Sequence, residues 1–404
     1  MDALDIITNL DNVIPFFQPI FSADEHRVIG YEVLGRYNHH GKYESLGKFF
    51  NDTNIPEEYR IEVDRTVLTK ALEKGAQLDQ DIYFFINKDV DLLLHKDGEP
   101  LLELLLAFEH KGVSPERIVI EVNTQHHQSE IEHLVYLLNY YKTYGINIAL
   151  DNFGNEGGKL DLIGQISPHI IKVNLQALRS VYIVPGFQEI IYSLSMLARK
   201  IGASLLFENI ETAYQLQYAW KNGGRYYQGF YLSKPSPEFI DRDLLKDKLR
   251  EECHSFILSE KKKLETLYSI SEKFQTKVAE LLQKYRKIED YEELLMALTK
   301  HLDKYAFRMY ICDEDGFQMS PNIIKRDKEW HIEKEYIQKN WSWRPYFLEN
   351  IIKMRKEKRG ILSDLYNDLE SGENIRTFSY PLNTGHYLFI DLSYEFLYEH
   401  QALL

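Results

Sequence analysis

The feature that most limits the fold is a repeated pattern in which short apolar runs, typical of β-strands, each end in one polar residue. The runs occupy residues 83–86, 118–120, 146–150, 205–207 and 226–227. The polar residues that follow them are Asn87, Glu121, Asp151, Glu208 and Gln228. Segments long enough for amphipathic helices, such as 101–110, 131–144 and 188–201, separate the runs. Strands that alternate with helices predict a parallel α/β fold. Polar residues at the carboxyl ends of such strands are typical of a (β/α)8-barrel active site.

An isolated carboxylate, Glu32, lies in another apolar run that begins at Val28. Alternation along a strand places Glu32, Leu34 and Arg36 on one face. A charge that faces inward is costly unless a metal ion or a bound phosphate compensates it. The alternative is an ordinary Glu–Arg pair exposed at the rim of the fold. The preceding strand-like run, 16–21, carries Gln18, and the turn after it predicts a hairpin with the Glu32 strand.

Length and charge limit the class of protein. A chain of 404 residues predicts two or three domains. A formal charge of −14 argues against polymeric nucleic acid as a partner, although a local arginine and a metal ion can hold a small nucleotide. No apolar run approaches the roughly 20 residues of a membrane span, which predicts no membrane insertion. The two cysteines, Cys253 and Cys312, lie far apart, which favours the reducing cytoplasm.

After the alternating region the sequence becomes highly charged and helical, and then rich in aromatic and β-prone residues. This change predicts three segments: a barrel domain at 1–252, a helical linker at 253–289 and a small α+β domain at 290–404. A charged closing helix is expected at 239–252, and a short helix at 1–14. Apolar residues at helical spacing from Leu264 to Tyr285 indicate either a coiled-coil seam, and hence a homodimer, or an amphipathic helix packed on one domain. An aromatic cluster at 341–347, expected on a helix, indicates either a sensory pocket or part of a core.

The polar residues at the strand ends suit a hard cation. Glu32, Asn87, Glu121, Asp151 and Glu208 offer only oxygen ligands, which favours Mg²⁺, Mn²⁺ or Ca²⁺ over zinc. Lys172 lies within the apolar run 170–174, where desolvation lowers its pKa unless a carboxylate lies beside it. Carboxylates, a divalent cation and a lysine together are the parts of metal-assisted phosphodiester hydrolysis. The alternative is a barrel whose rim residues only satisfy loop backbone groups.

Residues 12–240 resemble the EAL domain, a phosphodiesterase family that hydrolyses cyclic di-GMP to its linear dinucleotide. The matching motifs are Gln18-Pro19-Ile20, Glu32-Val33-Leu34 with Arg36, Asn87, Glu121, Asp151 with Phe153-Gly154, Lys172, Glu208 with Ile210-Glu211, Gln228-Gly229 and Ser233-Lys234-Pro235. The whole chain is similar to the YkuI-type proteins, in which a PAS/Cache-like domain follows the EAL domain.

The resemblance implies a fold and a set of residue roles. The fold is a TIM-like barrel with an antiparallel first strand, followed by a long helix and a small PAS-like sensor domain. The implied catalytic residues are Lys172, Glu32 and Glu208. The implied metal ligands are Glu32, Asn87, Glu121, Asp151 and Glu208, with Asn152 at the position of a second metal. The implied ligand-binding residues are Gln18, Leu34, Arg36, Gln228 and Glu211.

The sequence departs from the family pattern mainly on the side of that second metal. Asn152 stands where the family has a second aspartate, and Thr124 replaces a glutamate that braces the following loop, 155–159, which also differs. Smaller departures are Val33, Asn174, Asn209 and Arg225. We therefore expect a cyclic di-GMP-binding signalling protein with a weak or inactive phosphodiesterase site. The alternatives are an active phosphodiesterase regulated by the C-terminal domain and, less in keeping with the intact Gln18, Arg36 and Gln228, a structural scaffold.

Overall fold

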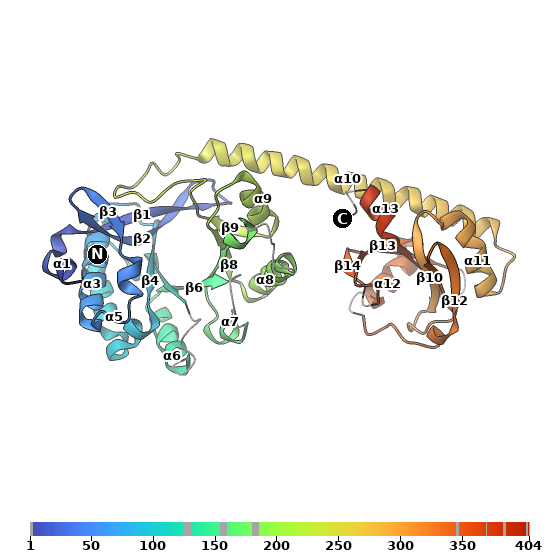
Figure 1. Cartoon of the computed structure of the whole chain (residues 1–404), viewed down its shortest axis with the longest axis horizontal. Coiled ribbons are helices and arrows are strands. Elements are labelled where there is room, and N and C mark those ends of the chain that lie inside the picture. Colours follow the sequence, from blue (N-terminus) through green and yellow to red (C-terminus); the bar gives the residue numbers. More distant parts are fainter. Residues whose placement is uncertain are drawn as a thin grey trace. The chain divides into compact units, whose positions relative to one another are not determined.

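The structure, a computed structural model, describes residues 3–123, 131–153, 160–179, 186–344, 347–368, 370–382, 385–400 and 403. The chain divides into two units, Met1–Phe256 and Ile257–Leu404 (Figure 1). Each unit is described by itself.

Eight strands close a barrel in the first unit. They are β1 (Val13–Ser22), β2 (Val28–His39), β4 (Tyr83–Lys88), β5 (Ile118–Val122), β6 (Asn147–Phe153), β7 (Ile170–Asn174), β8 (Ser204–Glu208) and β9 (Gly224–Tyr227). The strands from β2 through β9 pair in parallel, whereas β1 pairs antiparallel with both β2 and β9 and closes the ring. A short strand, β3 (Lys42–Ser45), extends the sheet beyond β2. The predicted TIM-like barrel with an antiparallel first strand is confirmed.

Helices surround the barrel strands in Figure 1. They are α1 (Ala3–Thr8), α2 (Gly47–Phe50), α3 (Glu57–Gly75), α4 (Val90–Leu94), α5 (Glu99–Glu109), α6 (Ile131–Lys142), α7 (Leu160–Ile166), α8 (Phe187–Ile201) and α9 (Ala213–Lys221). The helix expected over 1–14 is shorter, because β1 already begins at Val13. A capping box sets the start of α9. The hydroxyl of Thr212 accepts from the backbone N–H of Gln215, and the side chain of Gln215 accepts from the backbone N–H of Thr212.

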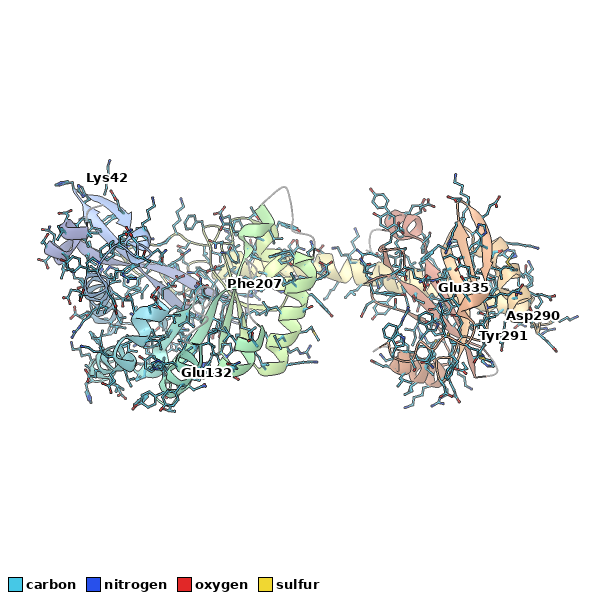
Figure 2. The ribbon with its side chains drawn as sticks, turned by 60° about the horizontal axis from the view of Figure 1, so that its bottom comes forward. Lys42, Glu132, Phe207, Asp290, Tyr291 and Glu335 are labelled. Carbon is cyan, nitrogen blue, oxygen red and sulfur yellow. The ribbon has the colours of Figure 1, made fainter. Side chains whose placement is uncertain are left out.

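Two apolar layers lie on the two faces of the barrel strands. The interior layer consists of Ile20, Ile29, Phe85, Val119, Ala149, Ile170 and Leu206, with Tyr83 and Tyr226 packed against it. The outer layer packs the strands against the helices, and it includes Phe207, labelled in Figure 2, the immediate neighbour of Leu206. Successive residues of a strand thus face opposite layers.

One long helix, α10 (Lys246–Lys284), belongs to both units. Leu249 and Phe256 pack in the first unit, whereas Phe274, Val278 and Leu281 pack in the second. The helix expected at 239–252 therefore begins only at Lys246 and continues without a break. Among the described residues, no helix is long and apolar enough to cross a membrane.

The second unit is built on a six-stranded antiparallel sheet in the order β12-β11-β10-β17-β16-β13. These strands are β10 (Ala306–Asp313), β11 (Asn322–Arg326), β12 (Glu329–Glu333), β13 (Ile361–Leu362), β16 (Thr377–Pro381) and β17 (His386–Leu392). A separate pair comprises β14 (Tyr366–Asn367) and β15 (Asn374–Ile375). The helices are α11 (Tyr291–Leu302), α12 (Phe347–Glu357) and α13 (Tyr394–Glu399). Asp290 caps α11 through its carboxylate, which accepts from the backbone of Glu293; Asp290 and Tyr291 are labelled in Figure 2.

Part of the aromatic cluster expected as either pocket or core is core: Phe347 is buried, and Trp341 packs against the same cluster. The helix in this region begins at Phe347, not at Trp341, and Trp343 is 62 % exposed. Tyr310, Phe347 and Phe389 are buried together on one face of the sheet. The cavity left beside them is about 10 Å³, room for about one water molecule. Residues 345–346 and 383–384 lie outside the described residues.

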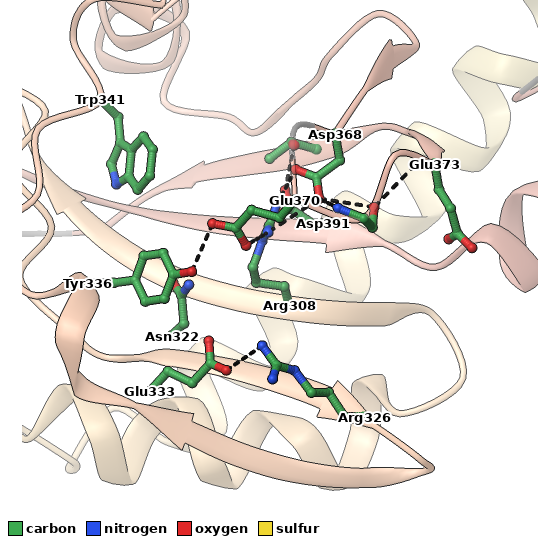
Figure 3. A network of polar contacts seen from close by, with 12 residues as sticks. Arg308, Asn322, Arg326, Glu333, Tyr336, Trp341, Asp368, Glu370, Glu373 and Asp391 are labelled. Atoms are coloured by element: carbon green, nitrogen blue, oxygen red, sulfur yellow. Dashed lines mark hydrogen bonds and ion pairs between the residues drawn. The ribbon is translucent and has the colours of Figure 1, made fainter.

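A buried arginine ties several segments of the second unit together (Figure 3). Arg308 on β10 donates to Asp391 of β17 at 2.6 Å, to Asp368 at 2.8 Å and to Glu370 at 2.8 Å. The hydroxyl of Tyr336 donates to Glu370 as well, at 2.9 Å. Asp391 and Asp368 raise the pKa of Arg308 despite its burial, so this guanidinium stays charged and fixes the turn between β14 and β15 on the sheet.

Candidate functional site

Strand alternation places the predicted site residues in one layer above the barrel interior. Asn87, Glu121, Asp151, Lys172 and Glu208 each lie two residues after an interior apolar residue of the same strand. Gln228 lies just past the end of β9, two residues after Tyr226, which packs against the same interior layer. Because the side-chain period of a strand is two, each follows its predecessor on the inner face. Their strands are parallel, so the six side chains meet at the carboxyl ends of the strands.

Glu32 reaches the same layer through an irregularity in β2. The pairing with β1 shifts register near Ile20, so Ile20 pairs with Gly30 and Gln18 pairs with Glu32. A Cβ atom at Gly30 would lie 2.8 Å from the carbonyl oxygen of Tyr83, which explains the glycine at this inner position. Glu32 follows two residues later and is 9 % exposed. This burial contradicts the alternative of an exposed pair at the rim.

Glu32 accepts hydrogen bonds on both carboxylate oxygens. Asn87 Nδ2 lies 2.6 Å from Oε1, and Gln228 Nε2 lies 2.6 Å from Oε2. Burial would raise the pKa of Glu32, but Lys172 and the two amides outweigh it and lower that pKa. Glu32 is therefore ionised at neutral pH.

Lys172 lies among four carboxylates and is 1 % exposed. Its Nζ atom is 2.7 Å from Glu121, 3.4 Å from Glu32, 3.4 Å from Glu208 and 3.9 Å from Asp151. Burial lowers the pKa of Lys172, but the carboxylates outweigh it and raise that pKa well above its usual value. Of the two outcomes expected for Lys172, the lysine beside carboxylates is the correct one.

Four carboxylates face one ammonium group, so the cluster carries excess negative charge. Burial raises the pKa of Glu208 to about 7 and that of Glu121 well above its usual range. Oxygen Oε1 of Glu121 is buried without a hydrogen-bond partner among the described residues. Oε1 of Gln228 is in the same situation. Unpartnered buried oxygens and surplus carboxylates fit a hard divalent cation.

The metal-ligand geometry itself is not formed among the described side chains, where no three acidic or histidine groups are placed to hold one ion. The carboxylates instead surround the ammonium group of Lys172, whose positive charge lies between them. The donor set therefore fits a divalent cation in its chemistry, since all of its ligating atoms are oxygens.

A cavity of about 470 Å³ opens beside this cluster. Its lining includes Glu32, Leu34, Arg36, Asn87 and Asp151. The Arg36 guanidinium lies 5.5 Å from the ring centroid of Phe16, and burial lowers its pKa somewhat while Glu32 opposes that change. The site residues thus face a space where an anionic ligand can meet both Arg36 and a cation.

Another ion pair lines the same cavity and was not predicted from the sequence. Lys88 on β4 is 8 % exposed and forms an ion pair with Asp64 of α3. Lys88 follows Asn87 directly, so it faces the outer side of its strand and meets the helix there. Asp64 lies on one face of a long helix, where spacing alone does not distinguish a cavity residue from a solvated one.

The remaining predicted residues lie around this site with less direct contact. Gln18 is half-buried on β1 opposite Glu32, and Glu211 donates its backbone N–H to Gln215 at 2.8 Å. Asn209 adopts a φ of 59°, a left-handed conformation that asparagine tolerates better than most residues. Gly229 is required by close approach, since a Cβ atom there would lie 2.1 Å from the carbonyl oxygen of Ile210.

Several departures from the family pattern lie where the structure gives no side-chain description. Asn152 is part of β6, but its side chain is outside the described residues, as are Thr124, Gly154 and the loop 155–159. Asn174 accepts from the backbone of Gln176, and Arg225 pairs with Asp24 on the surface.

Comparison with known families agrees with this geometry. The EAL domain model matches residues 2–235, and the model of the EAL-domain associated signalling protein domain matches residues 239–404. The chain therefore belongs to the EAL-domain signalling proteins.

Among its relatives is the uncharacterized EAL-domain containing protein YkuI of Bacillus subtilis, 50% identical over 406 residues that cover 100% of both chains. The crystal structure of B. subtilis YkuI, in complex with c-di-GMP as substrate and calcium, has a TM-score of 0.96 over 100% of both chains.

More distant relatives share the barrel. A probable cyclic di-GMP phosphodiesterase, PdeG of Escherichia coli, is 27% identical over 56% of this chain and 45% of its own length. The PaMucR phosphodiesterase in complex with c-di-GMP is 18% identical, with a TM-score of 0.53 over 59% of this chain and 98% of its own, and shares the fold.

Proposed function

We propose that this protein binds cyclic di-GMP in the barrel and hydrolyses it slowly or not at all. The observation that carries the proposal is the carboxylate–lysine cluster that opens onto the cavity with Arg36. The complex of B. subtilis YkuI with c-di-GMP and calcium supports it, since that protein is 50% identical over its whole length.

Arg36 is the proposed phosphate contact. A guanidinium can offer two parallel N–H donors to one phosphate, which a lysine cannot. Gln18, Leu34, Gln228 and Glu211 are the proposed residues that line the remainder of the dinucleotide site.

The proposed metal ligands are Glu32, Asn87, Glu121, Asp151 and Glu208. A divalent cation held there supplies neutralisation of the phosphate charge and a more acidic water molecule. Mg²⁺, Mn²⁺ and Ca²⁺ all suit oxygen ligands, and the YkuI crystal structure contains calcium. Lys172, charged and beside Glu121, would orient the phosphate or the attacking water by its N–H groups and, being protonated, would not act as a base.

The weak hydrolysis is inferred from Asn152. Where the family has an aspartate for a second cation, an amide coordinates only through a neutral carbonyl oxygen. Loss of one cation's stabilisation of the transition state lowers the rate by orders of magnitude while binding persists.

A second candidate is an active phosphodiesterase whose barrel is regulated by the second unit. Two observations favour it: the remaining carboxylates and Lys172 are together at one site, and the crystal structure of B. subtilis YkuI holds c-di-GMP as substrate. Turnover separates the two candidates.

Binding itself is tested by removing Arg36. Arg36→Ala should weaken cyclic di-GMP binding at least about tenfold in calorimetric titration with Ca²⁺, the equivalent of one charged hydrogen bond of about 1.4 kcal/mol. Arg250→Ala is the matched control, because it removes the same charge from an exposed position on α10 outside the cavity. Equal affinity of wild type and Arg36→Ala would remove Arg36 from the site.

A further inference from the structure

A second cleft, of about 820 Å³, lies within the second unit. One wall is α10 from Glu265 to Lys277, and the other comprises Lys304, Tyr305 and the end of α13 with Phe396, Glu399 and His400. We call it the α10–α13 cleft. It lies against the apolar layer of Phe274 and Phe396, not against the aromatic core of Tyr310 and Phe389 on the opposite face of the sheet.

Aromatic rings form the base of this cleft. The ring centroids of Phe274 and Tyr305 are 5.9 Å apart, those of Tyr305 and Phe396 are 5.2 Å apart, and those of Phe396 and His400 are 4.5 Å apart. Phe274 and Phe396 are buried, whereas Tyr305 and His400 are half-buried and present ring surface to the cleft. A concave site of this size with aromatic walls and a few polar groups suits a small organic ligand.

Positive charge surrounds the aromatic base. Lys273 and Lys277 lie one turn apart on α10, and Lys304 lies on the facing wall. The described residues place no carboxylate within ion-pair distance of these three ammonium groups. Three lysines outnumber the two acidic residues of the lining, Glu265 and Glu399, in a chain whose net charge is −14. Lys277 Nζ lies 4.8 Å from the ring centroid of Tyr305, so cationic and aromatic surfaces adjoin.

We propose that the α10–α13 cleft binds a small aromatic anion of the kind represented by a nucleoside monophosphate. Its ring lies against Tyr305 and His400, and its anionic group lies between Lys273, Lys277 and Lys304. Stacking on aromatic side chains and charge-assisted hydrogen bonds to the phosphate stabilise such a complex. The site is separate from the barrel and does not depend on cyclic di-GMP binding.

A ligand in this cleft would contact the helix that both units share. The cleft wall from Glu265 to Lys277 belongs to the same continuous helix whose residues Leu249 and Phe256 pack in the first unit. Bound ligand therefore stabilises α10 by mass action, since it binds the folded helix only.

The test uses 5′-AMP as the probe, with the full chain and saturation-transfer NMR or equilibrium dialysis. We expect 5′-AMP to bind with a Kd below about 1 mM, and adenosine, which lacks the phosphate, to bind at least about tenfold more weakly. Lys273→Glu combined with Lys277→Glu should abolish 5′-AMP binding and leave cyclic di-GMP binding unchanged.

The matched control is Lys261→Glu combined with Lys262→Glu, which makes the same charge change on exposed positions of α10 outside the cleft. This control and Arg36→Ala should both bind 5′-AMP as the wild type does. The proposal is overturned if the wild type binds no 5′-AMP up to about 1 mM, or if the control loses binding equally. Loss of 5′-AMP binding in Arg36→Ala would overturn it too, because the probe would then occupy the barrel.

Discussion

Lys172 sets the electrostatics of the barrel site at the scale of single residues. Its ammonium lies 2.7 to 3.9 Å from four carboxylates, and they keep it charged despite complete burial. The carboxylates still outnumber it, and part of the excess is relieved by protonation, as the raised pKa of Glu208 indicates. Cation binding must therefore displace a proton.

We predict that cation binding strengthens with rising pH and levels off above about pH 7. The pKa of Glu208 is raised to about 7, so the proton is bound below that pH and opposes the cation. In the cation-free protein the same shift makes folding less favourable as pH rises from the ordinary carboxyl pKa toward 7, because the folded state holds the extra proton there. Ca²⁺ titration should give an affinity about tenfold weaker near pH 6 than near pH 8.

Glu208→Gln is the control for this pH dependence, because it keeps the shape of the side chain and removes its titration. The variant should bind Ca²⁺ more weakly at every pH and lose the dependence between about pH 6 and 8. A wild-type affinity that stays constant over this range would contradict the assignment of Glu208 as a ligand that holds a proton.

Asn152→Asp should raise turnover of cyclic di-GMP from a low wild-type level, at least about tenfold, because it restores a charged oxygen for a second cation. Release of linear dinucleotide, followed by chromatography in Mn²⁺ and Mg²⁺, measures it. Asn367→Asp is the matched control, since it adds the same charge at an exposed position of β14 in the second unit, outside the barrel. If both variants match the wild type, Asn152 does not limit catalysis.

The sequence predicts positions in this site better than it predicts contacts. Glu121, Asp151 and Glu208 follow from strand ends and the period of two, so their shared layer was predictable. The state of Lys172 was not, because it depends on which carboxylates the closed barrel brings to within 4 Å. The Lys88–Asp64 pair was missed for the same reason, since a strand and a helix distant in sequence supply its two halves.

At the scale of elements, α10 divides its apolar residues between two uses. Phe274, Val278 and Leu281 are buried in the second unit, which matches the expectation of an amphipathic helix packed on one domain. Farther toward its start, Leu264 is 53 % exposed and Tyr268 is 67 % exposed. The apolar pattern from Leu264 to Tyr285 is thus continuous in the sequence, but only its second half is buried in the core of the second unit.

We predict that the exposed part of α10 supports a homodimer. Leu258, Leu264 and Tyr268 are exposed on α10. A second copy of the chain would bury their apolar surface in a dimer. Sedimentation at tens of micromolar should show dimer for the wild type and a shift toward monomer for Leu264→Glu. Lys262→Glu, an exposed change on the same helix, should leave the distribution unchanged. Monomer alone in the wild type would dispose of this dimer.

Element boundaries were less predictable than element types. The helix expected at 239–252 starts at Lys246, because residues 239–245 run beside the barrel first: Arg242 donates to the carbonyl of Val28 at 3.0 Å and pairs with Asp81. Nothing local in the sequence announces that contact, since its partners lie more than a hundred residues away.

At the scale of the whole molecule, the chain joins an EAL barrel to a second unit through one continuous helix. The division into a barrel domain at 1–252, a helical linker at 253–289 and an α+β domain at 290–404 stays a prediction. The structure assigns α10 residues to the cores of both units and leaves a cleft beside α10 in the second. We propose that the chain binds cyclic di-GMP and acts in signalling. Whether it also hydrolyses cyclic di-GMP decides between a receptor and a phosphodiesterase.

The most direct measurement incubates the wild-type chain with cyclic di-GMP in Mg²⁺ or Mn²⁺ and follows bound ligand and linear product together. We expect measurable binding with little or no linear dinucleotide. Brisk release of linear dinucleotide would contradict the receptor assignment and make the protein a working phosphodiesterase. Absence of both binding and product would contradict the proposed ligand itself.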